Sequence, residues 1–385
     1  MKVIVFDPHP AREDLLPMTY TRPVGDLRLG LMTIAERWQM YLPGEYFWLT
    51  EAYLTELFPA PDSPDDDTLY VAGNVIADAS LAAAVAALKS GETLTVGGTT
   101  VAYRGTERRR VDYTGAAPIF INQLYDIFMS NDAVIKADYA AVTAGRTGAP
   151  VSSTCTIIGD PSMLFLEEGV QAECAVFNVT HGPIYLGRDT EVMEGAVLRG
   201  PIATAEHCAF KLGAKVYGAT TLGPHCKMGG EISNVVVQGY TNKAHDGFLG
   251  NAVIGQWCNL GAGCTASNLK NNYAEIRLWN YRTNRFRRTG LQFCGLIMGD
   301  HSKAGINTAF NTATVVGVGC NIVSAGMPRV FIPSFSKGGS AGFDDVSMLE
   351  FFDTARRVMA RRSMVLTPAA ERMFNTIRDT AEAYR

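Results

Sequence analysis

Residues 242–268 read NKAHDGFLGNAVIGQWCNLGAGCTASN, and apolar side chains recur at every sixth position through this stretch and on both sides of it. The repeat falls into four runs. The longest run comprises Leu186, Val192, Leu198, Thr204, Phe210, Val216, Leu222 and Met228. The others comprise Ile158, Leu164, Val170 and Val176; Phe248, Ile254, Leu260 and Ala266; and Met298, Ala304, Phe310, Val316 and Ile322.

A period of six residues fits neither an amphipathic helix nor a simple alternating strand. It is typical of a hexapeptide β-helix, in which three short parallel strands form one coil of about 18 residues. The aliphatic residue of each hexapeptide then points inward, and the glycine that often follows it tolerates the positive φ of a turn. We therefore predict a left-handed parallel β-helix over residues 155–332.

Small residues occupy the position four places after the aliphatic one, and six of the eight cysteines fall there: Cys174, Cys208, Cys226, Cys258, Cys264 and Cys320. An unpaired cysteine in such a position behaves as a small apolar side chain. This placement argues against a disulfide framework and against a thiolate metal site. Because the N-terminal stretch MKVIVFD does not resemble a signal peptide, we predict a cytoplasmic protein.

Composition narrows the classes of partner. The 385 residues carry a net charge of −4, with 47% hydrophobic and 19% charged residues. Nucleic-acid-binding proteins usually present a basic surface, so we expect no nucleic-acid partner. The sequence contains no apolar run of about 18 residues, so we expect no membrane span. A chain of this length allows two or three domains.

The sequence on either side of the repeat predicts two further regions. Strands at 3–6, 45–49 and 68–71 and helices at 33–41, 79–89 and 122–144 alternate in residues 1–145, which predicts a small α/β domain. Residues 344–385 predict a tail of two helices that covers the last coil or a neighbouring subunit. Their predicted apolar faces comprise Val346, Leu349, Phe352, Met373 and Ile377.

The repeat is interrupted once, between Asn268 and Gly295, by a polar excursion. Its basic residues are Lys270, Arg277, Arg282, Arg285, Arg287 and Arg288. A loop of this length inside a compact domain is usually functional or flexible. Hexapeptide β-helices commonly have acyl-CoA sites, so we expect the excursion either to bind the phosphates of coenzyme A, through Lys270, Arg287 and Arg288, or to be a solvated charged loop.

His245 is the best candidate for chemistry. An enzyme that acylates an amine needs a base, because the ammonium must lose a proton before its nitrogen attacks a thioester, and histidine is suited to this step. Lys243 lies close in sequence and is a candidate for binding a substrate phosphate. The competing interpretation of His245 is a surface histidine at a β-helix corner.

Two other histidines, His207 and His225, are 18 residues apart and should stack on successive coils. A catalytic zinc site needs three protein ligands. Neither His181 nor His301 has the right spacing to supply the third, so we interpret the pair as stacked outward residues.

The region around His245 resembles the acetyltransferase half of the bifunctional glucosamine-1-phosphate acetyltransferase / N-acetylglucosamine-1-phosphate uridyltransferase family. The segments AHDGFLG (residues 244–250) and NLGAGC (259–264), closed by Asn268, carry the resemblance. It implies that His245 is the base, that Asn268 contacts the sugar or orients the histidine, and that Ala262 lies near the acetyl-CoA thioester. Phe248 stands where the family has a substrate-site tyrosine. Hexapeptide β-helices commonly form homotrimers with acyl-CoA sites between prisms, so we expect a homotrimer.

Residues 15–23, LLPMTYTRP, resemble the L-x-P-L-T-x-x-x-P segment of sugar-1-phosphate nucleotidyltransferases. The chain departs from that family elsewhere: FDPHPAR (residues 6–12) replaces the glycine-rich loop, and Gly73-Asn74 stands where the family has Gly-Asp. The resemblance implies that Arg22 and Arg28 bind phosphates of UTP or a sugar phosphate. Asp7 or Asp26 would hold Mg²⁺.

These observations predict an acetyl-CoA-dependent N-acetyltransferase that acts on an amino-sugar phosphate, which the resemblance suggests is glucosamine-1-phosphate. The attached domain is either an active uridyltransferase that makes UDP-N-acetylglucosamine or a relict binding module. Two alternatives remain open. One is a sugar-1-phosphate nucleotidyltransferase whose β-helix only oligomerises it, and the other is a non-catalytic nucleotide-sugar-binding scaffold.

Overall fold

The computed structural model describes residues 1–106, 109–323 and 326–385. It divides into two compact units. Residues 1–27, 32–126 and 367–376 form the first, and residues 28–31, 127–366 and 377–385 form the second. Within the described ranges, no helix combines the length and the apolar character that crossing a bilayer requires.

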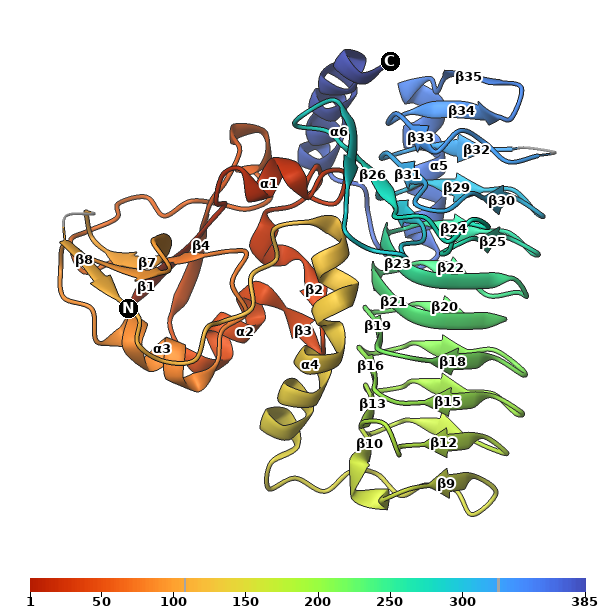
Figure 1. Cartoon of the computed structure of the whole chain (residues 1–385), viewed down its shortest axis with the longest axis horizontal. Coiled ribbons are helices and arrows are strands. Elements are labelled where there is room, and N and C mark those ends of the chain that lie inside the picture. Colours follow the sequence, from red (N-terminus) through yellow and green to blue (C-terminus); the bar gives the residue numbers. More distant parts are fainter. Residues whose placement is uncertain (107–108, 324–325) are drawn as a thin grey trace. The chain divides into compact units, whose positions relative to one another are not determined.

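The first unit is built on a mixed six-stranded sheet with the order β4-β1-β5-β7-β6-β8 (Figure 1). β1 is central to the parallel part and pairs with both β4 and β5. The strands are β1 (Lys2–Phe6), β4 (Glu45–Leu49), β5 (Leu69–Ala72), β6 (Glu92–Val96), β7 (Thr99–Arg104) and β8 (Arg109–Asp112). The helices are α1 (Ala11–Asp14), α2 (Ile34–Tyr41) and α3 (Ala79–Ala86). The predicted α/β character of this region is confirmed.

The start of α2 illustrates how sequence sets these elements. Thr33 accepts a hydrogen bond from the Glu36 amide, and the Glu36 carboxylate accepts one from the Thr33 amide. This reciprocal capping box satisfies two amides that have no partner within the helix. The predicted helix at 33–41 therefore begins where its capping residue stands.

The second unit is a parallel β-helix with three short strands in each coil, stacked in Figure 1 from β9 to β35. One face contains β9 (Thr156–Ile158), β12 (Val176–Asn178), β15 (Val197–Arg199), β18 (Lys215–Tyr217), β25 (Thr265–Ala266) and β30 (Ala309–Phe310). The next contains β10 (Leu164–Leu166), β13 (Ile184–Leu186), β16 (Ile202–Thr204), β19 (Thr220–Leu222), β28 (Ile297–Met298), β31 (Val315–Val316) and β33 (Phe331–Ile332). The long strands β21 (Glu231–Gly239) and β23 (Phe248–Gln256) run across both faces.

The third face is a ten-stranded sheet. Its strands are β11 (Gln171–Ala172), β14 (Glu191–Val192), β17 (Ala209–Phe210), β20 (Lys227–Met228), β22 (Asn242–Lys243), β24 (Asn259–Leu260), β29 (Lys303–Ala304), β32 (Asn321–Ile322), β34 (Ser336–Gly339) and β35 (Gly342–Asp345). All neighbouring pairs are parallel except the last, β34 with β35. The predicted β-helix is confirmed.

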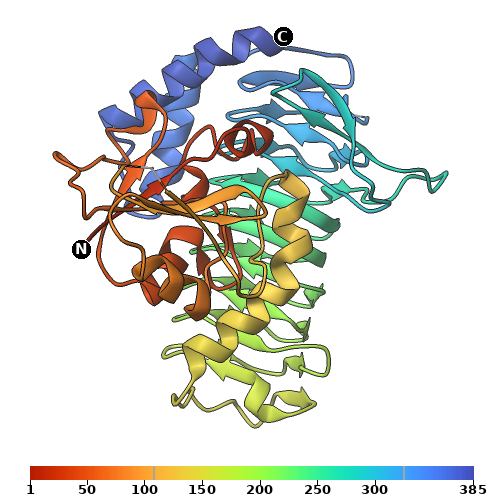
Figure 2. The same ribbon diagram turned by 60° about the vertical axis from the view of Figure 1, so that its left-hand side comes forward.

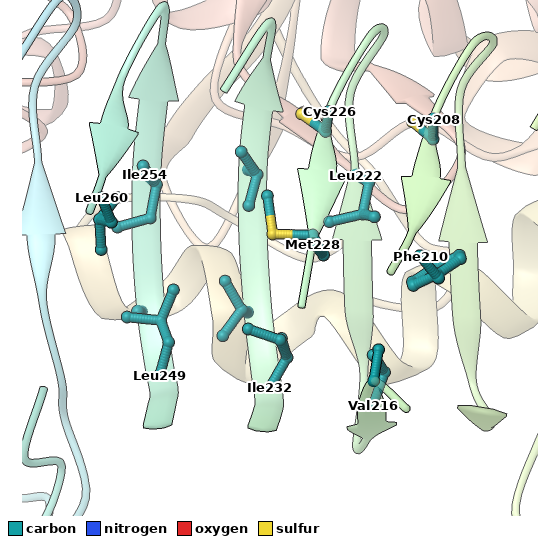
Figure 3. Close-up of a cluster of buried hydrophobic side chains, with 14 of the residues drawn as sticks. Cys208, Phe210, Val216, Leu222, Cys226, Met228, Ile232, Leu249, Ile254 and Leu260 are labelled. Carbon is teal, nitrogen blue, oxygen red and sulfur yellow. The ribbon is translucent and has the colours of Figure 1, made fainter. Parts of the chain in front are cut away.

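The inward side chains form one continuous apolar core, part of which Figure 3 shows. Every member of the longest predicted run, from Leu186 to Met228, is buried, as are the five residues of the run from Met298 to Ile322. Five of the six cysteines predicted to be internal are buried, and burial raises the pKa of Cys208 and Cys258 to about 12. Cys174 is the exception: it is exposed and adopts a positive φ of 50° at a corner.

The predicted inward positions are wrong at two places where the spacing along the chain departs from the period. In the first coil, Ile158 is 43% exposed, and Leu166, Ala172 and Phe177 are the buried residues. The reason is that Ala172 and Phe177 are five positions apart, one fewer than the period requires, so a regular count of six does not follow the inward side chains of this coil.

The second departure is at β23, where Leu249, and not Phe248, points inward. β23 passes from one face to the next as a continuous strand, and its inward residues Leu249 and Ile254 are one position closer together than the period requires. The missing position moves the inward side chain from Phe248 to Leu249.

The excursion leaves the stack after β25 and returns at β28, and it is coloured teal in Figures 1 and 2. It contains an antiparallel hairpin of β26 (Arg277–Asn280) and β27 (Arg285–Arg288). Trp279 of the hairpin stacks on Phe331 of β33, with ring centroids 4.1 Å apart. The excursion is therefore a folded element anchored to the prism.

A row of stacked rings lies along one corner of the prism. His207, His225, Tyr240, Trp257 and His301 occupy this corner, each with a positive φ. Their successive ring centroids are 4.7, 5.2, 4.2 and 6.0 Å apart. The predicted stacking of His207 on His225 is confirmed. His301 belongs to the same row despite its irregular spacing, because the excursion lies between it and Trp257 in the sequence.

Three helices complete the second unit and its connections. α4 (Leu124–Thr143) is anchored by the buried Asn131, which donates to the Ala219 carbonyl at 2.9 Å. α5 (Met348–Ala360) buries Phe351, Ala355 and Met359. Phe351 packs edge-on against His301, at 5.7 Å between centroids. The predicted inward residue Leu349 is 71% exposed, because the buried stripe lies on the opposite side of this helix. In α6 (Pro368–Ala381), the predicted Met373 and Ile377 are buried.

Candidate functional site

His245 lies at the corner between β22 and β23, and its side chain is exposed. Gly247 turns the chain there with φ +122°, where a Cβ would clash with the carbonyl oxygen of Cys264 on the next coil. The Asp246 carbonyl accepts a hydrogen bond from the Gly263 amide at 3.1 Å. The main chain beneath His245 is thus held against the neighbouring coil while the imidazole faces outward.

Ala262 occupies the matching corner of the next coil. Asn242 pairs with Asn259, so the residues three places further on, His245 and Ala262, are equivalent. Ala262 is exposed, and its carbonyl accepts from the Asn307 amide at 2.7 Å. A ligand group lying along this corner would meet both residues, which is compatible with the predicted acetyl-CoA contact at Ala262.

Lys243 is the residue whose position departs most from the sequence prediction. It lies in the inward row of the third face and is only 1% exposed. Its ammonium donates to the carbonyl oxygens of Gly229, at 3.0 Å, and His245, at 2.6 Å. Burial lowers its pKa to about 8. The predicted contact with a substrate phosphate does not fit this placement, because the ammonium is enclosed by protein and bonded to the main chain.

Phe248 and Asn268 lie together on the face that follows the His245 corner. A Cβ on Gly250 would stand 2.5 Å from Phe248 Cζ and 2.8 Å from Asn268 Nδ2. Glycine at position 250 therefore leaves room for the aromatic ring and the amide to approach each other. Phe248 is half-buried, so part of the ring remains accessible beside the histidine corner.

The Asn268 amide belongs to a ladder of asparagines on successive coils. Asn268 Nδ2 donates to Asn251 Oδ1 at 2.8 Å. With the Asn234 amide oriented to satisfy its neighbours, Asn251 Nδ2 donates to the Asn234 oxygen at 2.9 Å. No hydrogen bond between Asn268 and His245 occurs in the described residues. The structure thus places Asn268 beside Phe248 and leaves its predicted contact with a sugar as a prediction.

The excursion starts directly after Asn268 and ends beside it, because the Cys294 amide donates to the Asn268 carbonyl at 3.0 Å. Lys270 Nζ donates to the Glu275 carbonyl at 2.9 Å, and Arg288 lies 3.4 Å from the Glu275 carboxylate. Arg287 is exposed on β27, and its side chain makes no hydrogen bond or ion pair with the described residues. Of the three basic residues predicted to contact the coenzyme A phosphates, Arg287 is the one least engaged by the protein.

In the first unit, Asp7 follows β1 at the carboxyl end of the parallel strands, where α/β sheets commonly bind ligands. Both of its carboxylate oxygens are engaged. Oδ1 accepts from the Val24 amide at 2.7 Å, and Oδ2 accepts from Thr50 Oγ1 at 2.5 Å and from Arg12 Nε at 3.1 Å. Desolvation by burial raises the pKa of Asp7 despite these contacts. Asp7 therefore does not fit the predicted Mg²⁺ ligand.

The remaining predicted residues of the nucleotide site are also placed. Arg22 is buried, and its Nη2 donates to Thr21 Oγ1 at 3.3 Å. Arg28 lies in the second unit, where its Nη1 donates to the Leu31 carbonyl at 2.9 Å. Asp26 lies on a short 3-10 turn. Within the described residues, no group of three or more His, Cys, Asp or Glu side chains is arranged to hold a metal ion.

Sequence reasoning missed two groups of residues. The asparagine ladder carries a detectable signal, because the step from Asn234 to Asn251 equals the step from Asn251 to Asn268. No sequence signal identifies Arg12, the arginine that binds Asp7. Arg12 also donates to the Thr19 carbonyl and to Tyr53, and only the fold brings these residues close to it.

The N-terminal part of the chain matches a family model. The family model described as sugar nucleotidyl transferase matches residues 3–147. This match agrees with the resemblance seen in residues 15–23.

Curated relatives match the chain at low identity. The bifunctional protein GlmU of Synechococcus elongatus is 23% identical over 229 residues, which cover 54% of this chain and 46% of that protein. The bifunctional protein GlmU of Gloeobacter violaceus is 26% identical over 157 residues, 39% of this chain and 32% of that protein. That of Methanocaldococcus jannaschii is 28% identical over 90 residues, 23% and 21% of the two chains. The chain spans about half the length of the first of these relatives and less of the others. The family match, the relatives and the parallel β-helix together fit a GlmU-like fusion, in which a region that matches the sugar nucleotidyl transferase model is followed by a β-helix.

Proposed function

We propose that the β-helix transfers an acetyl group from acetyl-CoA to the amine of an amino-sugar phosphate, with His245 as the general base. One observation carries the proposal. The His245 imidazole is exposed on a corner whose main chain is hydrogen-bonded to the neighbouring coil. Phe248 follows this corner on the same coil, and Ala262 occupies the equivalent corner of the next coil. A base must be held in place and yet be reachable by substrate, and this arrangement meets both conditions.

In this reaction the amine nitrogen attacks the thioester carbonyl carbon, and His245 takes the proton that the nitrogen loses. The carbon–sulfur bond then breaks, and the coenzyme A thiolate leaves and is protonated. Phe248 offers an apolar surface for the sugar ring or the pantetheine arm. The cations of the excursion, with Arg287 the least engaged, are suited to phosphates of either substrate. The resemblance of residues 244–268 to the acetyltransferase family favours glucosamine-1-phosphate as the acceptor.

A thiol-release assay tests the proposal. The full chain is incubated with acetyl-CoA and a panel of amino-sugar phosphates, and free thiol is measured over time. We expect turnover with at least one acceptor, and we expect His245→Ala to lower kcat by about 100-fold or more, the usual contribution of a general base. His207→Ala, which removes another exposed histidine of the same prism, is the matched control. Wild-type turnover by the His245 variant would refute the assignment.

The hexapeptide β-helix and the resemblance support a homotrimer with acetyl-CoA sites between neighbouring prisms. Sedimentation equilibrium measures this directly, and a monomer that turns over acetyl-CoA would contradict it. Acetyl-CoA as co-substrate, together with eight cysteines that form no disulfide, supports a cytoplasmic location.

The family match over residues 3–147 favours a second candidate activity, nucleotidyl transfer from UTP to a sugar-1-phosphate. The engagement of Asp7 by Arg12 and Thr50 weighs against it and favours a binding module. Pyrophosphate release from UTP and N-acetylglucosamine-1-phosphate with Mg²⁺ separates the two. Turnover would support the transferase, and calorimetric binding of a nucleotide sugar without turnover would support the module.

A further inference from the structure

Lys243 occupies a position that the repeat reserves for apolar side chains. In the inward row of the third face it pairs with Met228 of the preceding coil, and Leu260 is the corresponding residue of the following coil. Both neighbours are buried and apolar. A charged ammonium costs free energy in such surroundings unless it is hydrogen-bonded, and a methionine of similar length would avoid that cost. A lysine at this inward position therefore requires hydrogen bonds that compensate for the burial of its charge.

The Lys243 ammonium bonds two corner carbonyls, those of Gly229 and His245. Elsewhere, corner carbonyls are bonded by amides of the next coil, as Asp246 is by Gly263 and Ala262 is by Asn307. In the described residues no main-chain amide bonds the carbonyls of Gly229 or His245. The coil between Met228 and Lys243 is shorter than a regular one, and the ammonium of Lys243 takes the place of the missing amides.

We propose that Lys243 is a positioning residue that holds the catalytic corner: by bonding the main-chain carbonyl of His245 from inside the prism, it fixes where the imidazole stands. The inference rests on the proposed function, since it assigns His245 the role of base. It also replaces the role predicted from the sequence, direct binding of a substrate phosphate. An ammonium bonded at 2.6 Å to the carbonyl of the base's own residue acts on the geometry of that residue and not on the substrate.

The chain contains a natural control. Lys303 makes the same kind of contact at another corner, where its ammonium donates to the carbonyls of Trp257, at 2.7 Å, and His301, at 2.8 Å. Each ammonium donates to two main-chain carbonyls, although Lys243 lies in the inward row and Lys303, which pairs with Asn259, is half-buried beside the inward Ala304. Replacing either one by methionine removes the same chemistry, but only Lys243 contacts the residue of the proposed base.

The experiment compares Lys243→Met, Lys243→Gln and Lys303→Met in the full chain. Far-UV circular dichroism and thermal melting select a temperature at which all three are folded. We expect Lys243→Met to lower kcat for acetyl transfer by about tenfold or more, because small displacements of a catalytic group are costly. The KM for acetyl-CoA and for the amino sugar should stay within about twofold of wild type. Lys243→Gln, which keeps one donor group, should give an intermediate kcat, and Lys303→Met a wild-type one.

Hydrogen exchange measured by mass spectrometry provides a readout independent of activity. Peptides that contain residues 244–247 should exchange faster in Lys243→Met than in wild type or Lys303→Met. Unchanged exchange there would overturn the proposal, even if the wild-type protein showed no acetyl transfer. A large rise in KM for the phosphate acceptor at unchanged kcat would also overturn it, because that result would mean the ammonium binds substrate directly.

Discussion

The most informative prediction concerns the stability effect of Lys303, the second lysine whose ammonium is bonded to two main-chain carbonyls. Desolvation by burial lowers its pKa from 10.5 to about 8. In the unfolded chain the same ammonium should titrate at about 10.4. Between these two values the unfolded state binds more protons than the folded state, so the stability that depends on this group rises with pH.

The magnitude follows from the size of the shift. One pKa unit corresponds to about 1.4 kcal/mol, so a shift of this size costs the folded protein on the order of 3 kcal/mol at neutral pH. Most of that cost, about 2 kcal/mol, disappears by about pH 10. Lys303→Met removes the cost but leaves the Trp257 and His301 carbonyls without their donor, which costs about 1–3 kcal/mol for a buried group. That second effect is nearly independent of pH, because a neutral amine also donates.

The assay is thermal unfolding of wild type and Lys303→Met across this pH range. Buried cysteines with raised pKa values destabilise the folded state as pH rises, so only the difference between the two proteins is informative. Between about pH 7 and pH 10, we expect the free energy of unfolding of wild type to rise by about 2 kcal/mol relative to that of Lys303→Met. This corresponds to a rise of roughly 5 °C in the Tm difference. Lys215→Met, at an exposed lysine, should show no such trend. A pH-independent difference for Lys303→Met would refute the reasoning.

Two further predictions concern the two candidate sites. Gly250→Ala should leave the prism folded but lower acetyl transfer, because the added Cβ forces Phe248 and Asn268 apart; unchanged kcat and KM would contradict the placement of these side chains at the site. Arg12→Met should destabilise the first unit by about 3–5 kcal/mol, since it leaves the buried Asp7 carboxylate without its cation. Urea unfolding checks this, and a loss below about 1 kcal/mol would show that the pair contributes little.

The six-residue period is sufficient to predict the β-helix, because an inward side chain is required at every strand of every coil. It is insufficient wherever the chain gains or loses residues between inward positions. The period assigns Phe248 to the core in place of Leu249, since β23 is one position short between Leu249 and Ile254. Counting residues detects the period but does not detect where a corner is tightened, which depends on backbone contacts between coils.

The candidate site is predictable in part. The local sequence around His245 identifies the corner, and the family resemblance points to Ala262, which the structure places on the next coil. The interior position of Lys243 is not predicted, because lysine at an inward position contradicts the rule used to find inward positions. The Asp7–Arg12 pair escapes detection for a different reason: the sequence suggests Asp7 as a metal ligand and gives Arg12 no role, and only the folded loop brings the two side chains together.

The row of rings at the prism corner gives this molecule an internal optical reporter. The Trp257 indole stacks on Tyr240 at 4.2 Å and faces His301 at 6.0 Å, and His301 in turn touches Phe351 of α5. Indole emission is sensitive to the polarity and charge of adjacent rings. Detachment of α5 would therefore hydrate that imidazole and change the emission of a tryptophan two contacts away. Trp257 is one of four tryptophans, so a variant in which the other three are replaced by phenylalanine would report movement of the tail in a fluorimeter without any added label.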